Sequence, residues 1–242
     1  MAEIVYHSAS YSHVGMVRQV NEDACLDAPQ AGVWLVADGM GGHAAGDFVS
    51  NLIVDRLRSL QAPFALDGHL RLLRETLQQV NAEVRAEAAR RGVQMMGATL
   101  VLLLARENRA FCLWAGDSRL YRLRNEQLEC ISRDHSYVQE LVDSQLLSDA
   151  EARLHPMGNI VTRAVGVDEQ LELAERELQV APGDSFLLCS DGLNKTAEDH
   201  ELHEVLRHSD PYAVVRSLVH LGLTRGAPDN ITALVVKAVW KP

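Results

Sequence analysis

Short apolar runs that end in an aspartate are the feature of this sequence that most constrains its fold. One such run lies within Val33–Ser50, and Asp38 stands where a buried strand would end. Gly39, Gly41 and Gly42 follow, and glycine reaches backbone angles that are closed to other residues and lets a ligand approach closely. Asp38 is therefore the first candidate for a functional side chain.

Two further aspartates repeat this pattern, and a third stands at the other end of its strand. Asp117 and Asp191 follow the runs AFCLWAG and SFLLCS, whereas Asp229 stands just before the apolar run ITALVVKAV. Carboxylates at strand ends can converge on one point. Carboxylate and carbonyl oxygens, together with water, suit hard cations, so this set predicts Mg²⁺ or Mn²⁺ rather than zinc.

Hydrophobic periodicity indicates the class of fold. Apolar residues at helical spacing predict two successive helices, within residues 49–60 and 70–84. Short apolar pieces separated by turns predict a first strand at 4–12 and a meander of antiparallel strands from residue 97 onwards, including 159–165 and 171–178. Two more helices are expected at 198–207 and 211–224, before a last strand. Strands in runs with helices in pairs predict an α+β fold of antiparallel sheets covered by helices.

Size and charge limit the function. The strand-like runs continue from Val33 to Val239, which favours one domain over residues 1–242. A net charge of −10 without a lysine- or arginine-rich run argues against nucleic acid as a partner. No apolar run approaches the ~18 residues of a membrane span, and a signal-peptide core is absent, so we expect a cytoplasmic protein without membrane contact. A monomer is the default expectation.

A second group of charged residues lies near the start of the chain, where Arg18, Glu22 and Asp23 stand close together. The planar guanidinium fork of Arg18 is suited to bind two phosphate oxygens. Two ions roughly 3.5–4 Å apart can share and activate a water for attack on phosphorus, so the residues suggest phosphate-ester hydrolysis. A strand-end aspartate is as often a turn former or helix cap, and the charged trio equally fits a solvated turn. The residues alone leave both interpretations open.

The order of the motifs resembles a known family. Taken together they are similar to the bacterial form of the metal-dependent serine/threonine phosphatases of the protein phosphatase 2C (PPM) family. The resemblance spans nearly the whole chain and rests on these segments: Arg18 with Asn21–Asp23, Val36–His43, Gly97–Leu100, Ala115–Arg119, Asp134–Ser136, Ser190–Leu193 and Gly226–Thr232.

This resemblance implies a four-layer α/β/β/α sandwich with two central antiparallel sheets and a flap segment at about 136–158. It implies two Mn²⁺ or Mg²⁺ ions and a hydrolysis in which a water or hydroxide that bridges them attacks the phosphorus of phosphoserine or phosphothreonine in proteins. The ligands would be Asp38 as the bridging carboxylate, the Gly39 carbonyl, Asp191 and Asp229. Residues with further implied roles are Glu22 and Asp23, which would hold metal-bound waters, and Arg18, which would bind phosphate.

The likeness also suggests a signalling enzyme that reverses a bacterial serine/threonine kinase, as do relatives encoded with kinase partners, including in type VI secretion clusters.

Two departures from the family pattern matter. Met40 stands where many relatives have a histidine that is proposed as general acid; His43 is the nearest replacement and equally fits a loop-stabilising role. In relatives, the segment Ser-Asp-Gly-Leu is usually followed two residues later by an aspartate, which helps the residue that matches Asp117 to hold a third metal. This chain has Asn194 and Lys195 at those two positions. We therefore hypothesise that the third ion is weakened or lost and that the Lys195 ammonium supplies part of its charge.

Two rival functions fit the sequence less well. A cysteine phosphatase would use Cys189 as its nucleophile. The phosphate-binding loop of such enzymes needs an arginine where this chain has Lys195 and a histidine where it has Leu188. The alternative outside enzyme chemistry is a catalytically weak phosphatase fold kept as a binding or regulatory module for phosphoproteins. Such a module would tolerate the loss of a metal aspartate, whereas this chain retains all three, Asp38, Asp191 and Asp229.

Overall fold

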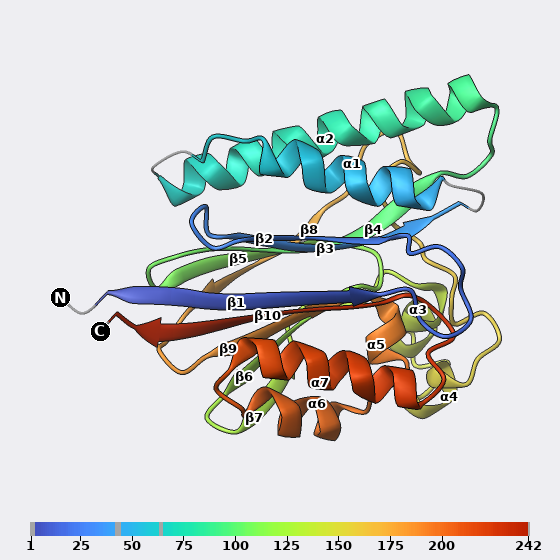
Figure 1. Ribbon diagram of the computed structural model, residues 1–242. Helices are drawn as coiled ribbons and strands as arrows, with labels where there is room; N and C mark the ends of the chain where they lie inside the picture. Colours follow the sequence, from blue (N-terminus) through green and yellow to red (C-terminus); the bar gives the residue numbers. More distant parts are fainter. Residues whose placement is uncertain (1–2, 42–44, 63–64, 242) are drawn as a thin grey trace.

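Two antiparallel sheets stack face to face and carry helices on their outer faces (Figure 1). The structure, a computed structural model, describes residues 3–41, 45–62 and 65–241. One sheet has the strand order β2-β3-β4-β5-β8 and the other the order β1-β10-β9-β6-β7. The predicted α+β class and the α/β/β/α layering are thereby confirmed.

The first sheet and its helices come mainly from the first half of the chain. Helices α1 and α2 cover its outer face (Figure 1). The bounds are β2 Asp23–Ala28, β3 Val33–Met40, α1 Gly46–Arg58, α2 Leu66–Arg91, β4 Gly97–Arg106, β5 Arg109–Ala115 and β8 Ala174–Gln179.

The second sheet is assembled from both ends of the chain, because β1 pairs with β10 over the full length of both strands. Helices α6 and α7 cover its outer face, and α3, α4 and α5 lie at one end of the sandwich (Figure 1). The bounds are β1 Ile4–His13, β6 Arg119–Arg124, β7 Gln127–Cys130, α3 Tyr137–Asp143, α4 Asp149–Arg153, β9 Ser185–Cys189, α5 Asp191–Asn194, α6 Asp199–Leu206, α7 Pro211–Thr224 and β10 Ile231–Trp240.

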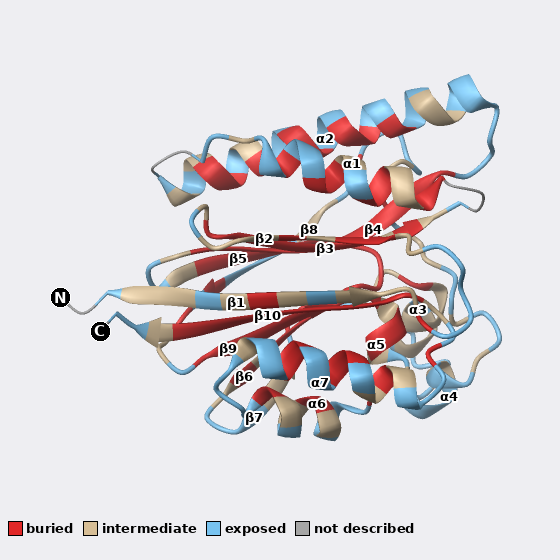
Figure 2. Ribbon diagram, viewed as in Figure 1, coloured by how far each residue is buried: buried red, intermediate tan, exposed pale blue. Residues whose placement is uncertain are grey.

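Three apolar cores separate the four layers, and Figure 2 shows buried residues along the strands of both sheets and on the helices that cover them. Between the sheets, Trp34, Leu103 and Phe186 have no solvent-accessible surface. Strands that are buried on both faces need continuous apolar runs, which explains β4 and β10. None of the described helices has the length and apolar character to cross a membrane.

The helix ends follow local rules. Helix α2 ends at Gly92, which adopts the left-handed conformation with φ +68°. Asp210 caps α7 by accepting hydrogen bonds from the amides of Tyr212 and Ala213, and Pro211 occupies the first turn. The flap segment contains α3 and α4, each capped by a serine hydroxyl.

One predicted strand is wrong. Residues 159–165 form only isolated bridges, Ser136 to Val161 and Ala98 to Val165. Their backbone bonds go to separate neighbours: the Thr162 amide donates to the His135 carbonyl, and Val165 exchanges bonds with Ala98. The segment therefore runs between the flap and β4 instead of alongside one strand, which its β-branched composition could not reveal.

Candidate metal centre and active site

Asp38 and Asp23 face each other across two neighbouring strands. Asp38 lies near the end of β3, and its partner in the antiparallel register of β2 is Asp23. Directly opposed residues project to the same face, where two like charges destabilise a sheet. The pair therefore calls for a proton or a cation between the carboxylates.

The surroundings of Asp38 increase this demand for positive charge. Burial, and then the neighbouring Asp23, Asp191, Asp117 and Asp229, raise the pKa of Asp38 well above its usual range. Burial also raises the pKa values of Asp23 and Asp117, each to about 7. Within the described residues, Oδ1 of Asp23 is buried without a hydrogen-bond partner. A buried carboxylate group of this kind fits a divalent cation, which supplies the missing charge.

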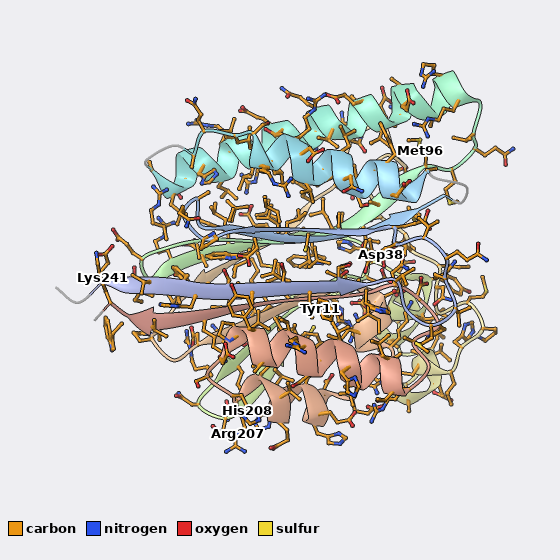
Figure 3. All side chains as sticks on the ribbon, viewed as in Figure 1. Tyr11, Asp38, Met96, Arg207, His208 and Lys241 are labelled. Carbon is orange, nitrogen blue, oxygen red and sulfur yellow. The ribbon has the colours of Figure 1, made fainter. Side chains whose placement is uncertain are left out.

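Two of the remaining carboxylates lie beside strands of the second sheet, and the third lies where the chain crosses between the sheets. Asp191 begins α5 directly after β9, and Asp229 lies just before β10, the strand that pairs with β9. Asp117 follows β5 and precedes β6, where the chain crosses from one sheet to the other. Figure 3 shows Asp38 between the two sheets, toward the end where α3, α4 and α5 lie. The site therefore depends on both halves of the sandwich.

These carboxylates do not form a closed cage. Among the described residues, no group of three or more His, Cys, Asp or Glu side chains is placed to hold a metal ion alone. Mg²⁺ does not need such a cage, because it keeps several waters and binds one or two carboxylates. The arrangement accordingly suits a hydrated hard cation and not a zinc site built entirely from protein ligands.

Arg18 lies at the mouth of the site. Its Nη2 atom donates to Oδ2 of Asp229 at 2.7 Å, and about half of its side chain is exposed. An exposed guanidinium beside a carboxylate can turn its fork toward an incoming phosphate. Asp229 thus holds Arg18 beside the carboxylates, where the sequence analysis predicts that phosphate binds.

Glu22 and Gly39 pack against the start of α1. The Gly39 amide donates to the Glu22 carbonyl at 3.1 Å, and the Glu22 carboxylate accepts from the Gly46 amide. A Cβ atom on Gly39 would lie 2.2 Å from the Gly46 carbonyl oxygen, so only glycine fits. The local need for glycine is therefore the approach of a helix to the strand.

Lys195 places an ammonium among three oxygen-bearing side chains. Its Nζ atom lies 2.6 Å from Oδ2 of Asp191, 2.8 Å from Oδ1 of Asn159 and 3.4 Å from Oδ2 of Asp117. Burial alone would lower the pKa of Lys195, but the carboxylates of Asp191 and Asp117 outweigh this effect and raise it. The ammonium is an internal counter-ion for both carboxylates.

Sequence reasoning gave no role to the polar residues that join the two sheets beneath the site. Ser190 and Thr232 each donate a hydroxyl hydrogen bond to Oδ2 of Asp23 at 2.7 Å. Oδ1 of Asn230 accepts from the Glu22 amide at 2.8 Å, while its side-chain amide donates to carbonyls of the 14–20 loop. Their signal in the sequence was a polar residue at the end of an apolar strand.

His43, Met40 and Cys189 receive no role in the site, each for a different reason. His43 lies outside the described residues, so its position is not assigned. Met40 follows Gly39 in β3, and its thioether has no proton to give. Cys189 is completely buried in β9, and burial raises the pKa of its thiol, which excludes it as a phosphatase nucleophile.

Comparison with known proteins agrees with this geometry. The profile described as "Protein phosphatase 2C" matches residues 11–222. The chain is 34% identical over 238 residues to serine/threonine protein phosphatase PstP of Mycobacterium tuberculosis, an alignment that covers 98% of this chain and 46% of PstP. The chain thus spans about half the length of that relative.

Two solved structures show the same fold. PppA, a key regulatory component of T6SS in Pseudomonas aeruginosa, superimposes with a TM-score of 0.93 at 70% identity, covering 98% of this chain and 100% of PppA. The catalytic domain of PstP in complex with two manganese ions gives a TM-score of 0.86 at 32% identity and covers 98% and 99% of the two chains. The chain therefore belongs to the protein phosphatase 2C family of metal-dependent serine/threonine phosphatases.

Proposed function

We propose that this chain hydrolyses phosphoserine and phosphothreonine in proteins with two Mn²⁺ or Mg²⁺ ions, and that it reverses a bacterial serine/threonine kinase. The observation that carries the proposal is the opposed pair of Asp23 and Asp38, with Asp191 and Asp229 brought to it from the second sheet. The two manganese ions of the PstP catalytic domain, on the same fold, support the choice and number of metals.

The chain's own residues divide the work. Asp38 would bridge the two ions, the Gly39 carbonyl, Asp191 and Asp229 would complete the ligand set, and Glu22 with Asp23 would orient bound waters. When bound, the ions lower the pKa of a water and clamp the oxygens of an in-line displacement at phosphorus. Arg18 would leave Asp229 to bind and orient the phosphate through its two parallel N–H donors.

Phosphate release from a phosphothreonine peptide with Mn²⁺ tests this function. The wild-type protein and Cys189→Ser should release phosphate at the same rate, because the buried thiol takes no part. If the wild-type protein binds the peptide but releases no phosphate, the chain is a binding module and the proposal fails. Loss of release in Cys189→Ser, with the variant still folded by circular dichroism, would instead point to a cysteine mechanism.

Lys195 should limit the number of bound ions to two. Its ammonium lies between Asp117 and Asp191, where an additional cation would need the same two carboxylates. Lys195→Asp removes that ammonium and adds a carboxylate, so the variant should bind one more Mn²⁺ per chain. Titration of free Mn²⁺, followed by its electron paramagnetic resonance signal, counts the ions directly.

The matched control is Lys241→Asp, because Lys241 is an exposed lysine paired with Glu3 away from the site. It should bind the same number of ions as the wild-type protein. A third ion in the wild-type protein, or an unchanged count in Lys195→Asp, would show that Lys195 does not replace a metal.

A further inference from the structure

Exposed apolar side chains gather around the mouth of the site. Most of the large apolar residues that are exposed in the described part of the chain belong to loops at this end of the sandwich. Met16 and Val17, at 65% and 67% exposure, stand directly before Arg18. We call the following set the apolar rim: Met16, Val17, Val20, Val93, Met95, Met157, Ile160 and Val167.

The first part of the rim is fixed to the metal-binding loop before β10. The Met16 amide donates to the Ala227 carbonyl at 2.9 Å, and Arg18 pairs with Asp229 at 2.7 Å. The Asn230 side chain holds the Val20 carbonyl at 3.0 Å. Apolar residues on both sides of Arg18 are therefore held in place beside the guanidinium that would take the phosphate.

The other parts of the rim adjoin the site from two further directions. A Cβ atom on Gly41 would lie 2.7 Å from the Met95 carbonyl oxygen, so the turn after Asp38 runs against Met95. A Cβ atom on Gly97 would lie 3.0 Å from Cε of Met40 and 3.5 Å from Cγ2 of Val167. On the flap side, Asn159, which lies between Met157 and Ile160 in the chain, accepts from the Lys195 ammonium.

Three of the four segments that form the rim together carry a single charge, whereas the fourth, around Val167, continues into Asp168 and Glu169. The segments VGMVRQVN at 14–21, VQMMG at 93–97 and HPMGNIVT at 155–162 contain no aspartate, glutamate or lysine, and Arg18 is their one arginine. In the chain as a whole, 23% of residues are charged. Exposed apolar side chains that gather beside a functional site favour an interaction surface there, and methionine adapts its shape to different partners.

We propose that the apolar rim binds apolar side chains that flank the phosphorylated serine or threonine of the protein substrate. The inference rests on the proposed function, because it names the substrate segment that the same site would take. Phosphate bound at Arg18 places the neighbouring substrate residues over Met16, Val17 and the flap side of the rim. Basic neighbours would find no acidic residue in the rim segments at 14–21, 93–97 and 155–162, and acidic neighbours would meet a protein of net charge −10.

Three phosphothreonine peptides that differ only in the residues beside phosphothreonine test this inference. With Mn²⁺, the peptide flanked by leucine should have a kcat/KM about tenfold above those flanked by lysine or by glutamate, since contacts between apolar groups discriminate by about that order. Equal values for the three peptides would overturn the inference.

The double variant Met16→Ser/Val17→Ser should remove most of this preference, and Met157→Ser should act in the same direction from the flap side. Hydrolysis of p-nitrophenyl phosphate should not change in either variant, because this small ester does not reach the rim. Tyr212→Ser is the matched control, since Tyr212 is an exposed aromatic residue on α7 with 66% exposure. It should keep the wild-type preference for leucine.

The remaining outcomes separate the two proposals. If no peptide and no p-nitrophenyl phosphate is hydrolysed, the proposed function fails, whereas hydrolysis without a flanking preference sinks only the inference about the rim. A rim covered by a second copy of the chain would make the wild-type protein sediment as a dimer. If the double serine variant then sedimented as a monomer and kept the peptide preference, the rim would be a dimer interface and the inference would be wrong.

Discussion

Asp38→Asn should lower the rate of phosphate release in Mn²⁺ by more than about 1,000-fold. Loss of a residue that only hydrogen-bonds to a metal ligand already lowers metal affinity or activity by about 10- to 100-fold, and loss of a ligand should cost more. Asp38 contributes the carboxylate that the other acidic residues surround, so no neighbour can replace it. Asparagine keeps the shape of the side chain but not the charge that would hold the ion. The measurement is phosphate release from a phosphothreonine peptide.

The same variant should be more stable than the wild-type protein when both are free of metal. Asp38→Asn removes one of the two charges that face each other across β2 and β3, and with it their repulsion. Thermal unfolding in a chelator should give the variant the higher melting temperature. Asp55→Asn, on the exposed face of α1, is the control and should keep full activity. Full activity in Asp38→Asn would refute the proposed metal centre.

Removal of the metal should abolish phosphate release and also lower the melting temperature. Because the carboxylates come from both sheets, an ion between them binds the folded chain and not the unfolded one. At 100 times its dissociation constant, such an ion stabilises the fold by about 2.7 kcal/mol, which for a chain of this size corresponds to roughly 5–10 °C.

The experiment compares unfolding and phosphate release in EDTA, in Mn²⁺ and in Mg²⁺. Either metal should restore both properties of the wild-type protein, and Asp38→Asn should show little gain in melting temperature from either. Phosphate release that continues in EDTA would rule out the metal-dependent mechanism. An equal thermal gain in wild type and Asp38→Asn would mean that the ion binds elsewhere.

Much of the fold could be predicted because the buried faces of its helices and strands produce local hydrophobic patterns in the sequence. The apolar stripes of α1 and α2 and the doubly buried runs of β4 and β10 are readable without any neighbour. The end of α2 was predicted at residue 84, but the helix extends to Arg91. The prediction stopped short because the last turns are solvent-exposed and have no apolar stripe. Residues 159–165 were misassigned because single bridges to separate neighbours leave no periodic signal.

The candidate site could be proposed from its residue types, but its contacts could not be predicted. Aspartates at strand ends suggested a cation site, yet the opposition of Asp23 and Asp38 depends on the register of two strands, which no local pattern states. The bonds of Ser190 and Thr232 to Asp23 join residues that are 167 and 209 positions apart in the chain. The same holds for Asn159, which meets Lys195 only because the flap segment folds back to the site.

The hydrogen bonds that Ser190, Thr232 and Asn230 make beneath the site should restrict the motion of the backbone there. Thr232 has no exposed surface, and its amide donates to the Ser190 hydroxyl at 3.0 Å. Amides held in this way open only when a large unit of the structure opens with them, so their hydrogen exchange should be among the slowest in the chain. The floor of the site is then its least dynamic part, and substrate entry must depend on the loops above it.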